Sequence, residues 1–189
     1  MPETDAIFDN IKAKDTLHER HDVKRLSIDC KATVNLGEFA RGGKTRGPNQ
    51  ALDPNFGSNG KSIPCGILDE KSGQFYLHFG SSYKTSDFIV DNLQSWWTSL
   101  PDLEQQETRL IQLKIDNGPE SSGIRTQFLK RIVDFSDEIG RPIQLLYYPP
   151  YHSKYNPIER CWGILEQHWN GTLLQDIQRV RPLFDTIIR

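Results

Sequence analysis

The sequence is poor in sulfur-containing residues. Its 189 residues include three cysteines and one methionine. The cysteines are Cys30, Cys65 and Cys161, and no two of them stand in a C-x-x-C pattern. An odd number of cysteines without that spacing argues against a disulfide scaffold and a structural zinc site, and it favours a reducing compartment.

Segments that direct a chain into a membrane are also lacking. No run approaches the roughly 18 consecutive apolar residues of a membrane span. Residues 1–15 contain no apolar stretch flanked by basic residues, so they do not resemble a secretory signal. These absences predict a soluble, cytoplasmic protein without a membrane partner.

An excess of positive charge is missing as well. The chain has 23 Lys and Arg against 25 Asp and Glu, which gives a net charge of −2. A free-standing DNA-binding domain is usually basic. If this chain acts on nucleic acid, its contacts are therefore local, or a basic partner domain lies outside the sequence.

Large aromatic side chains, in contrast, are abundant. Nine Phe, six Tyr and four Trp supply enough apolar surface for a packed core. This composition argues against a disordered chain, and the length suits about one domain.

Apolar periodicity predicts three strands followed by alternating strands and helices. The expected strands cover residues 24–31, 63–68, 75–79, 110–115 and 143–148, and the expected helices cover 86–100, 124–139 and a segment starting at 156. Extended chain is expected to continue through Val34 and Leu36. This order predicts an α/β fold with a mixed five-stranded sheet flanked by helices.

Two stretches fall outside this pattern. Residues 1–23 are polar, with one weak helical pattern around Ile7, Phe8 and Ile11, which indicates a linker or the remains of a preceding helix. Residues 41–61 are rich in glycine, proline, asparagine and basic residues. They predict a long loop, and long loops inside compact domains are usually functional or mobile.

Three acidic residues stand at notable positions. Asp29 lies in the first expected strand, Asp116 ends the fourth, and Glu159 lies in the first turn of the last helix. If the first and fourth strands are neighbours, the aspartates lie side by side and the helix brings Glu159 to them. Unpaired carboxylates in one place raise each other's pKa, and Mg²⁺ or Mn²⁺ relieves that repulsion. Two such ions promote phosphodiester cleavage.

Each of these positions also has a structural explanation. Asp116 begins an Asp-Asn-Gly sequence that is common in turns. Asn156, Pro157 and Glu159 have the spacing of a helix capping box. Asp29 is harder to explain in this way, because aspartate is depleted from strands.

Several segments resemble DDE transposases. Residues 27–31, SIDCK, resemble the first catalytic strand, and residues 148–159, YPPYHSKYNPIE, are similar to the Pro-Pro…Asn-Pro-Ile-Glu segment of mariner-like and related insertion-sequence enzymes. Residues 63–67 and 167–171 most resemble the Rhodopirellula-type DDE transposases of bacteria. The resemblance covers about residues 24–180.

This resemblance implies a ribonuclease-H-like catalytic domain that uses two Mg²⁺ ions, for which Mn²⁺ substitutes. Asp29 is then the ligand shared by both ions, and Asp116 and Glu159 each hold one. The implied reaction is hydrolysis of DNA at a transposon end, followed by attack of the freed 3′-hydroxyl on target DNA. The implied partners are both DNAs and further copies of the chain in a synaptic complex, at the bacterial nucleoid.

The resemblance also implies a division of the chain. Residues 1–23 are a linker or a remnant of a preceding region, residues 24–180 the catalytic domain, and residues 181–189 a truncated tail. Only 28 residues precede Asp29, too few for the helix-turn-helix domains of such transposases, so we expect a fragment. The alternative is an inactive or domesticated remnant that binds DNA or protein. A host ribonuclease H or junction resolvase fits less well, because those enzymes lack the Asn-Pro-Ile-Glu segment.

Five further residues are candidate DNA contacts. Arg41, Lys44 and Arg46 stand in the glycine-rich stretch, where basic side chains can neutralise phosphates. His152 and Lys154 precede the helix of Glu159, near the expected scissile phosphate. The alternatives are a solvated loop in the first case and ordinary loop structure in the second.

Two remaining pairs have mainly structural explanations. His18 and His21 have a helical metal-binding spacing, but their polar surroundings predict an exposed or unstructured segment. Trp96 and Trp97 offer rings for stacking on bases, but their place in an amphipathic pattern predicts at least one of them in the core. Trp162 and Trp169 are expected in the core for the same reason.

Overall fold

The computed structural model describes residues 2–17, 21–37, 60–80, 83–150 and 152–169. The helices are α1 (Pro2–Leu17), α2 (Ser86–Ser99), α3 (Asp102–Glu107), α4 (Thr126–Ile139) and α5 (Ile158–Trp169), with a 3₁₀ turn, η1 (Ser153–Tyr155). The strands are β1 (Val23–Cys30), β2 (Val34–Leu36), β3 (Gly60–Asp69), β4 (Phe75–Gly80), β5 (Leu110–Asp116) and β6 (Ile143–Tyr148). None of the described helices is both long enough and apolar enough to cross a membrane.

The strands form one mixed sheet, as predicted. Its order is β2-β3-β1-β5-β6, and β4 pairs with β3. The pairs of β3 with β1, β2 and β4 are antiparallel, whereas β1–β5 and β5–β6 are parallel. The sheet has six strands instead of the expected five, because Val34–Leu36 pairs with the start of β3 while β1 pairs with its end.

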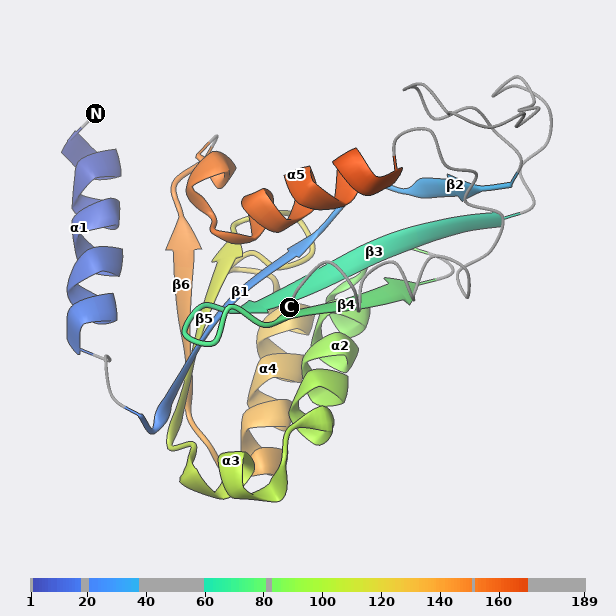
Figure 1. Ribbon diagram of the computed structural model, residues 1–189. Helices are drawn as coiled ribbons and strands as arrows, with labels where there is room; N and C mark the ends of the chain where they lie inside the picture. Colours follow the sequence, from blue (N-terminus) through green and yellow to red (C-terminus); the bar gives the residue numbers. More distant parts are fainter. Residues whose placement is uncertain (1, 18–20, 38–59, 81–82, 151, 170–189) are drawn as a thin grey trace.

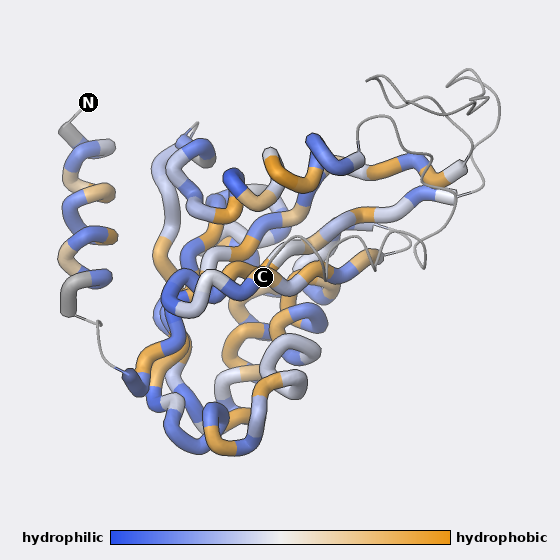
Figure 2. The backbone as a smooth tube through the Cα atoms, viewed as in Figure 1, coloured by the Kyte–Doolittle hydropathy of each residue, from blue (hydrophilic) through white to orange (hydrophobic). Residues whose placement is uncertain are grey.

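One face of the sheet is covered by α2 and α4, which pack side by side (Figure 1). Leu26 and Ile28 of β1 and Leu113 and Ile115 of β5 belong to this main core, which Phe128 of α4 completes. The intervening residues of these strands face the other way, because side chains alternate along a strand. Figure 2 shows the resulting alternation of hydrophobic and hydrophilic positions.

The helix ends follow mostly from local chemistry. Thr85 caps α2, since its Oγ1 accepts a hydrogen bond from the Phe88 N–H at 3.1 Å. Gly140 ends α4 in the left-handed conformation, with φ 63°, that glycine tolerates best. The expected start of α4 was wrong. Ile124 is 90% exposed and precedes the helix, because the chain is still in a turn where the Arg125 N–H donates to the Ser122 carbonyl.

The opposite face is covered by α5 and α1. The buried face of α5 packs on β2, β3 and β4, in a cluster that includes Trp162 and Leu68. Ile11 of α1 packs with Leu146 and Tyr148 of β6. The weak helical pattern expected near the N-terminus therefore belongs to a docked helix. Polar positions of β1 and β5 lie on the face that these two helices share.

Candidate active site

Asp29 and Asp116 follow one another across neighbouring parallel strands. The register aligns Ser27 with Lys114 and Ile28 with Ile115, so the two aspartates are the next step along β1 and β5. Since Ile28 and Ile115 face the main core, the aspartates face the side of α1 and α5. The prediction that the strands of Asp29 and Asp116 are neighbours in the sheet is confirmed.

Glu159 joins them from the first turn of α5. Its pKa lies above the ordinary value for a glutamate, first because of burial and then because of the charges on Asp29 and Asp116. The Lys31 ammonium acts in the opposite direction. The three carboxylates that the sequence singled out therefore lie within electrostatic reach of one another.

Asp116 has a buried carboxylate oxygen without a hydrogen-bond partner among the described residues. Its Oδ1 is buried and accepts no hydrogen bond in the described part of the chain. Burial, followed by the charge on Asp29, raises the pKa of this carboxyl group, while Lys84 lowers it. The Asp116 backbone carbonyl accepts from Ser121 Oγ at 2.8 Å, which holds the chain in the turn after β5. An unsatisfied buried oxygen next to other carboxylates suits a cation.

The capping alternative for Glu159 is met only in part. Asn156 is buried, and its Oδ1 accepts from the Ile158 N–H at a long 3.5 Å. Among the described residues, the Glu159 carboxylate forms no return hydrogen bond to the Asn156 N–H, which a capping box requires. The Glu159 side chain is therefore not used as a cap.

A closed metal site is absent from the described ranges. No group of three or more His, Cys, Asp or Glu side chains there is arranged so that it could hold a metal ion. The donor chemistry nevertheless fits a hard divalent cation, because all three candidates offer carboxylate oxygens and one of those oxygens lacks a partner. The three side chains are thus gathered in one region without the spacing of a ligand set.

Two side chains outside the predicted set, Trp162 and Lys31, lie beside the three carboxylates. The Trp162 indole N–H donates to Asp29 Oδ2 at 2.9 Å. Lys31 lies 5.8 Å from the centre of the Trp162 ring and forms an ion pair with Glu166 at 2.5 Å. Helical spacing was the available signal, because Trp162 and Glu166 follow Glu159 by about one and two turns on the same face.

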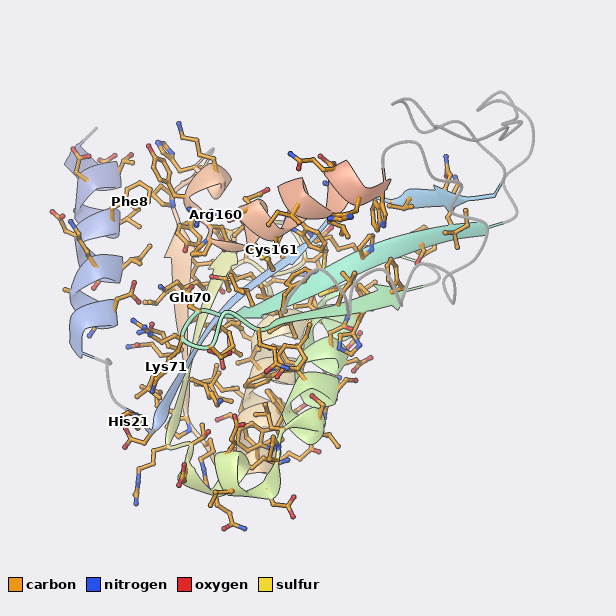
Figure 3. All side chains as sticks on the ribbon, in the orientation of Figure 1. Phe8, His21, Glu70, Lys71, Arg160 and Cys161 are labelled. Atoms are coloured by element: carbon orange, nitrogen blue, oxygen red, sulfur yellow. The ribbon has the colours of Figure 1, made fainter. Side chains whose placement is uncertain are left out.

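The segment between β6 and α5 holds the other described candidates. His152 Nδ1 lies 2.7 Å from the Pro150 carbonyl oxygen, and its ring stacks on Tyr155 with centroids 6.0 Å apart. Lys154 Nζ lies 5.0 Å from the centre of the Tyr155 ring. Phe8 of α1, which is labelled in Figure 3, lies edge-on to the rings of both His152 and Tyr155. Helix α1 thus contacts the chain just before the helix that carries Glu159.

The remaining candidates are placed as follows. Arg41, Lys44, Arg46 and His18 lie outside the described residues. His21 Nδ1 lies 3.2 Å from Lys71 Nζ, at the far end of β1 from Asp29. The core positions expected for the tryptophans are confirmed, since all four are buried: Trp96, Trp97, Trp162 and Trp169.

Comparison of the sequence with known protein families identifies the family to which the chain belongs. The sequence matches the Rhodopirellula transposase DDE domain over residues 1–186. The chain belongs to this family. The resemblance inferred from the SIDCK and YPPYHSKYNPIE segments is thereby confirmed. No curated protein matches the sequence.

Solved structures share the fold of this transposase-family domain. The Mos1 transposase paired-end complex with left transposon end has a TM-score of 0.66 and 11% identity, over 98% of this chain and 53% of that chain. The Mos1 strand transfer complex has a TM-score of 0.64 and 11% identity, over 98% and 52%. A simian T-cell lymphotropic virus intasome in complex with PP2A regulatory subunit B56 gamma has a TM-score of 0.54 and 13% identity, over 85% and 46%.

These similarities concern the fold of the chain. At such low identity they show a shared fold, which is ribonuclease-H-like, as the sequence resemblance implied. The chain spans about half the length of the Mos1 chains, 53% and 52%.

Proposed function

We propose that this chain is the catalytic domain of a DDE transposase, which hydrolyses DNA phosphodiester bonds at transposon ends and transfers the freed strand to target DNA. The observation that carries the proposal is that Asp29, Asp116 and Glu159 lie within electrostatic reach of one another, and that a buried oxygen of Asp116 accepts no hydrogen bond among the described residues. Membership in the transposase DDE family supports the reaction class.

Asp29, Asp116 and Glu159 would hold two Mg²⁺ ions, for which Mn²⁺ substitutes. When bound, such ions lower the pKa of a water or hydroxyl nucleophile and stabilise the leaving oxygen. The protein contributes concentrated negative charge that is partly shielded from water, which raises the affinity for a cation. Lys31 and Lys84 place positive charge at the margins of the site, the sign that attracts a DNA phosphate.

Binding of DNA by this chain is part of the same proposal. Arg41, Lys44, Arg46, His152 and Lys154 are the proposed contacts, with positive charge for the phosphates. A net charge of −2 makes the affinity of residues 1–189 for DNA weak, so we assign recognition of transposon ends to a synaptic assembly of several chains. The Mos1 relative was solved as a paired-end complex with a transposon end.

A second candidate is a non-catalytic remnant that binds DNA or protein. It is favoured by the absence, from the described residues, of side chains arranged to hold a metal ion. The two candidates differ in one property, which is whether the three carboxylates together bind a divalent cation.

Calorimetric titration with Mn²⁺ and Mg²⁺ tests this property, with and without a DNA duplex. We expect binding by the wild-type chain, with affinity reduced by more than about a hundredfold in Asp29→Asn and Asp116→Asn. Asp134→Asn is the matched control, because this exposed aspartate of α4 lies outside the site. Absence of carboxylate-dependent binding, even with DNA present, would favour the remnant.

A cleavage assay on transposon-end DNA completes the test. Asp116→Asn should stay folded and lose Mg²⁺-dependent nicking, while Asp134→Asn keeps it. Unchanged nicking by Asp116→Asn would contradict the assigned site.

A further inference from the structure

We propose that Trp162 is a positioning residue that ties α5 to the Asp29 carboxylate and so holds Glu159 at its working distance from β1. The inference rests on the proposed function, since it assigns Trp162 a role in assembling the cation site.

The first observation is the hydrogen bond itself. Trp162 Nε1 donates to Asp29 Oδ2 at 2.9 Å, and the tryptophan is only 2% exposed. An indole N–H only donates and carries no charge, so this partner orients the carboxylate without neutralising it. A hydrogen bond to an ionised acceptor is also stronger than a neutral one. Asp29 is thereby oriented by a group that does not compete for the cation.

The second observation is the place of Trp162 on the helix. It follows Glu159 by three residues, so both side chains lie on one side of α5, about 4.5 Å apart along its axis. A bond between Trp162 and β1 therefore sets the height of the Glu159 turn above Asp29. Sliding or rotation of α5 would break this bond and move Glu159 at the same time.

The third observation is a socket that fits the indole closely. Gly66 of β3 pairs with Asp29 of β1. A Cβ at Gly66 would lie 2.6 Å and 2.8 Å from two Phe75 ring atoms and 3.0 Å from Trp162 Cη2. The Phe75 and Trp162 rings meet edge to face, with centroids 5.5 Å apart and planes at 88°. Glycine is thus needed directly opposite Asp29 so that both rings can approach the strand.

Lys31 lies against the other side of the Trp162 ring. Lys31 Nζ lies 5.8 Å from the Trp162 ring centre and pairs with Glu166 of α5 at 2.5 Å. The end of β1 and the residue that follows it therefore contact α5 twice, through Asp29 with Trp162 and through Lys31 with Glu166. Ordinary core packing would require apolar contact only, whereas here the polar atom of the ring meets a proposed cation ligand.

The experiment compares two tryptophans of the same helix. Trp162→Phe keeps a ring for Phe75 and loses the N–H, whereas Trp169→Phe makes the same change at a buried position about 10 Å further along α5. Mn²⁺ affinity is measured by calorimetry with a DNA duplex present, and thermal melts check that both variants fold. We expect a loss of about 10- to 100-fold in Trp162→Phe and less than about threefold in Trp169→Phe.

A spectroscopic readout separates positioning from general stability. In ¹⁵N-labelled protein, the indole signal that Trp162→Phe removes should shift on addition of Mg²⁺ and should broaden first with Mn²⁺. The same signal should move in Asp29→Ala, where its acceptor is gone. An indole signal of Trp162 that ignores both the cation and Asp29→Ala would overturn the inference.

The other outcomes are equally distinct. If Trp162→Phe binds Mn²⁺ as tightly as wild type, the positioning role is wrong while the proposed function stands. If wild type binds no cation with DNA present, the proposed function fails and the role of Trp162 fails with it. Should Trp162→Phe not fold, Gly66→Ala is the second variant: its Cβ would crowd the Phe75 ring most and the Trp162 indole at 3.0 Å, and the shift of both rings should weaken Mn²⁺ binding. Unchanged binding in a folded Gly66→Ala would overturn the inference.

Discussion

Two groups of acidic side chains lie on the same face of β1 and β5, two residues apart along the strands. In the first group, Lys114 of β5 is 3% exposed and its Nζ lies 2.7 Å from both Glu70 Oε2 and Asp15 Oδ2. Ser27 Oγ, across from Lys114 in the register, also donates to Glu70. Figure 3 shows Glu70 on the side of the sheet toward α1, the helix that carries Asp15. In this lysine cluster the Lys114 ammonium compensates both carboxylate charges, although the second oxygen of Asp15, Oδ1, is buried and accepts no hydrogen bond among the described residues.

The second group is the candidate active site, where no lysine of the described ranges forms an ion pair with Asp116 or Glu159. Among the described residues, Asp116 and Glu159 form no ion pair, and Asp116 Oδ1 accepts no hydrogen bond. The nearby lysines are engaged elsewhere, Lys31 with Glu166 at 2.5 Å and Lys84 with Glu120 at 3.9 Å. The same sheet face thus holds one compensated and one uncompensated acidic group. Acidity alone therefore does not distinguish the candidate cation site from the lysine cluster, whereas the lack of an ion-pair partner among the described residues does.

The largest expected change in the free energy of unfolding comes from removing the positive charge of the lysine cluster. Lys114→Met leaves Glu70 and Asp15 beside each other without a cation. Breaking a buried ion pair in this way costs about 3–5 kcal/mol in the free energy of unfolding, measured by urea denaturation. A loss below about 1 kcal/mol would mean that water already solvates these carboxylates, and the contrast between the two groups would fail.

The next effect tests where a cation binds. Mn²⁺ at about 100 times its dissociation constant should raise the free energy of unfolding by about 2.7 kcal/mol, because the ion binds the folded chain. Thermal or urea unfolding with DNA-free protein measures this gain. It should vanish in Asp116→Asn and persist in Glu70→Gln. A gain that depends on Glu70 instead would assign the cation to the lysine cluster.

A smaller effect of opposite sign is expected in the metal-free active site. Asp116→Asn removes one of two like charges on adjacent strands, so at pH 7 it should be as stable as wild type or more stable by about 0.2–1 kcal/mol. The pKa values of Asp116 and Glu159 are raised in the folded state, mainly by burial. Acidification through those pKa values therefore stabilises the folded wild type relative to Asp116→Asn.

Urea unfolding of both proteins between pH 7 and pH 4 measures this difference. The advantage of Asp116→Asn should shrink as the pH falls. An advantage that grows toward acid would mean that the Asp116 charge is compensated in the folded chain, as the charges of the lysine cluster are.

The smallest effect is expected from an exposed ion pair, which calibrates the others. Lys130 and Asp134 lie 2.7 Å apart on α4, with side chains 70% and 49% exposed. Lys130→Met should change the free energy of unfolding by no more than about 0.5 kcal/mol, because water screens the pair. A cost similar to that of Lys114→Met would show that burial does not distinguish these lysines.

Sequence patterns predicted the strands that carry Asp29 and Asp116 better than the contacts around them. The positions of Asp29 and Asp116 followed from strand alternation and element order, and both strands are neighbours. Lys114 was not foreseen as a buried ion-pair partner, because Asp15 and Glu70 lie 99 and 44 residues away along the chain. Such contacts depend on which elements dock, and local periodicity carries no information about docking.

The errors in the fold have similar causes. Strand β2 (Val34–Leu36) was expected as extended chain but not as a sixth strand of the sheet, because its pairing depends on β3 extending beyond β1. Helix α3 (Asp102–Glu107) has no buried residues and so no apolar face to recognise. Ile124 continued the helical spacing of α4, but the turn after β5 keeps it out of the helix.

The sequence by itself determined most of the order of strands and helices and the family, and it singled out the three carboxylates that we propose as the site, since periodicity and short motifs are local properties. Only the tertiary structure decided which acids are compensated. Docking of α1 brings Asp15 to Lys114, and docking of α5 brings Trp162 to Asp29. The physical reason is that charge interactions and hydrogen bonds depend on distance and burial in space. Spacing along the chain fixes neither of them.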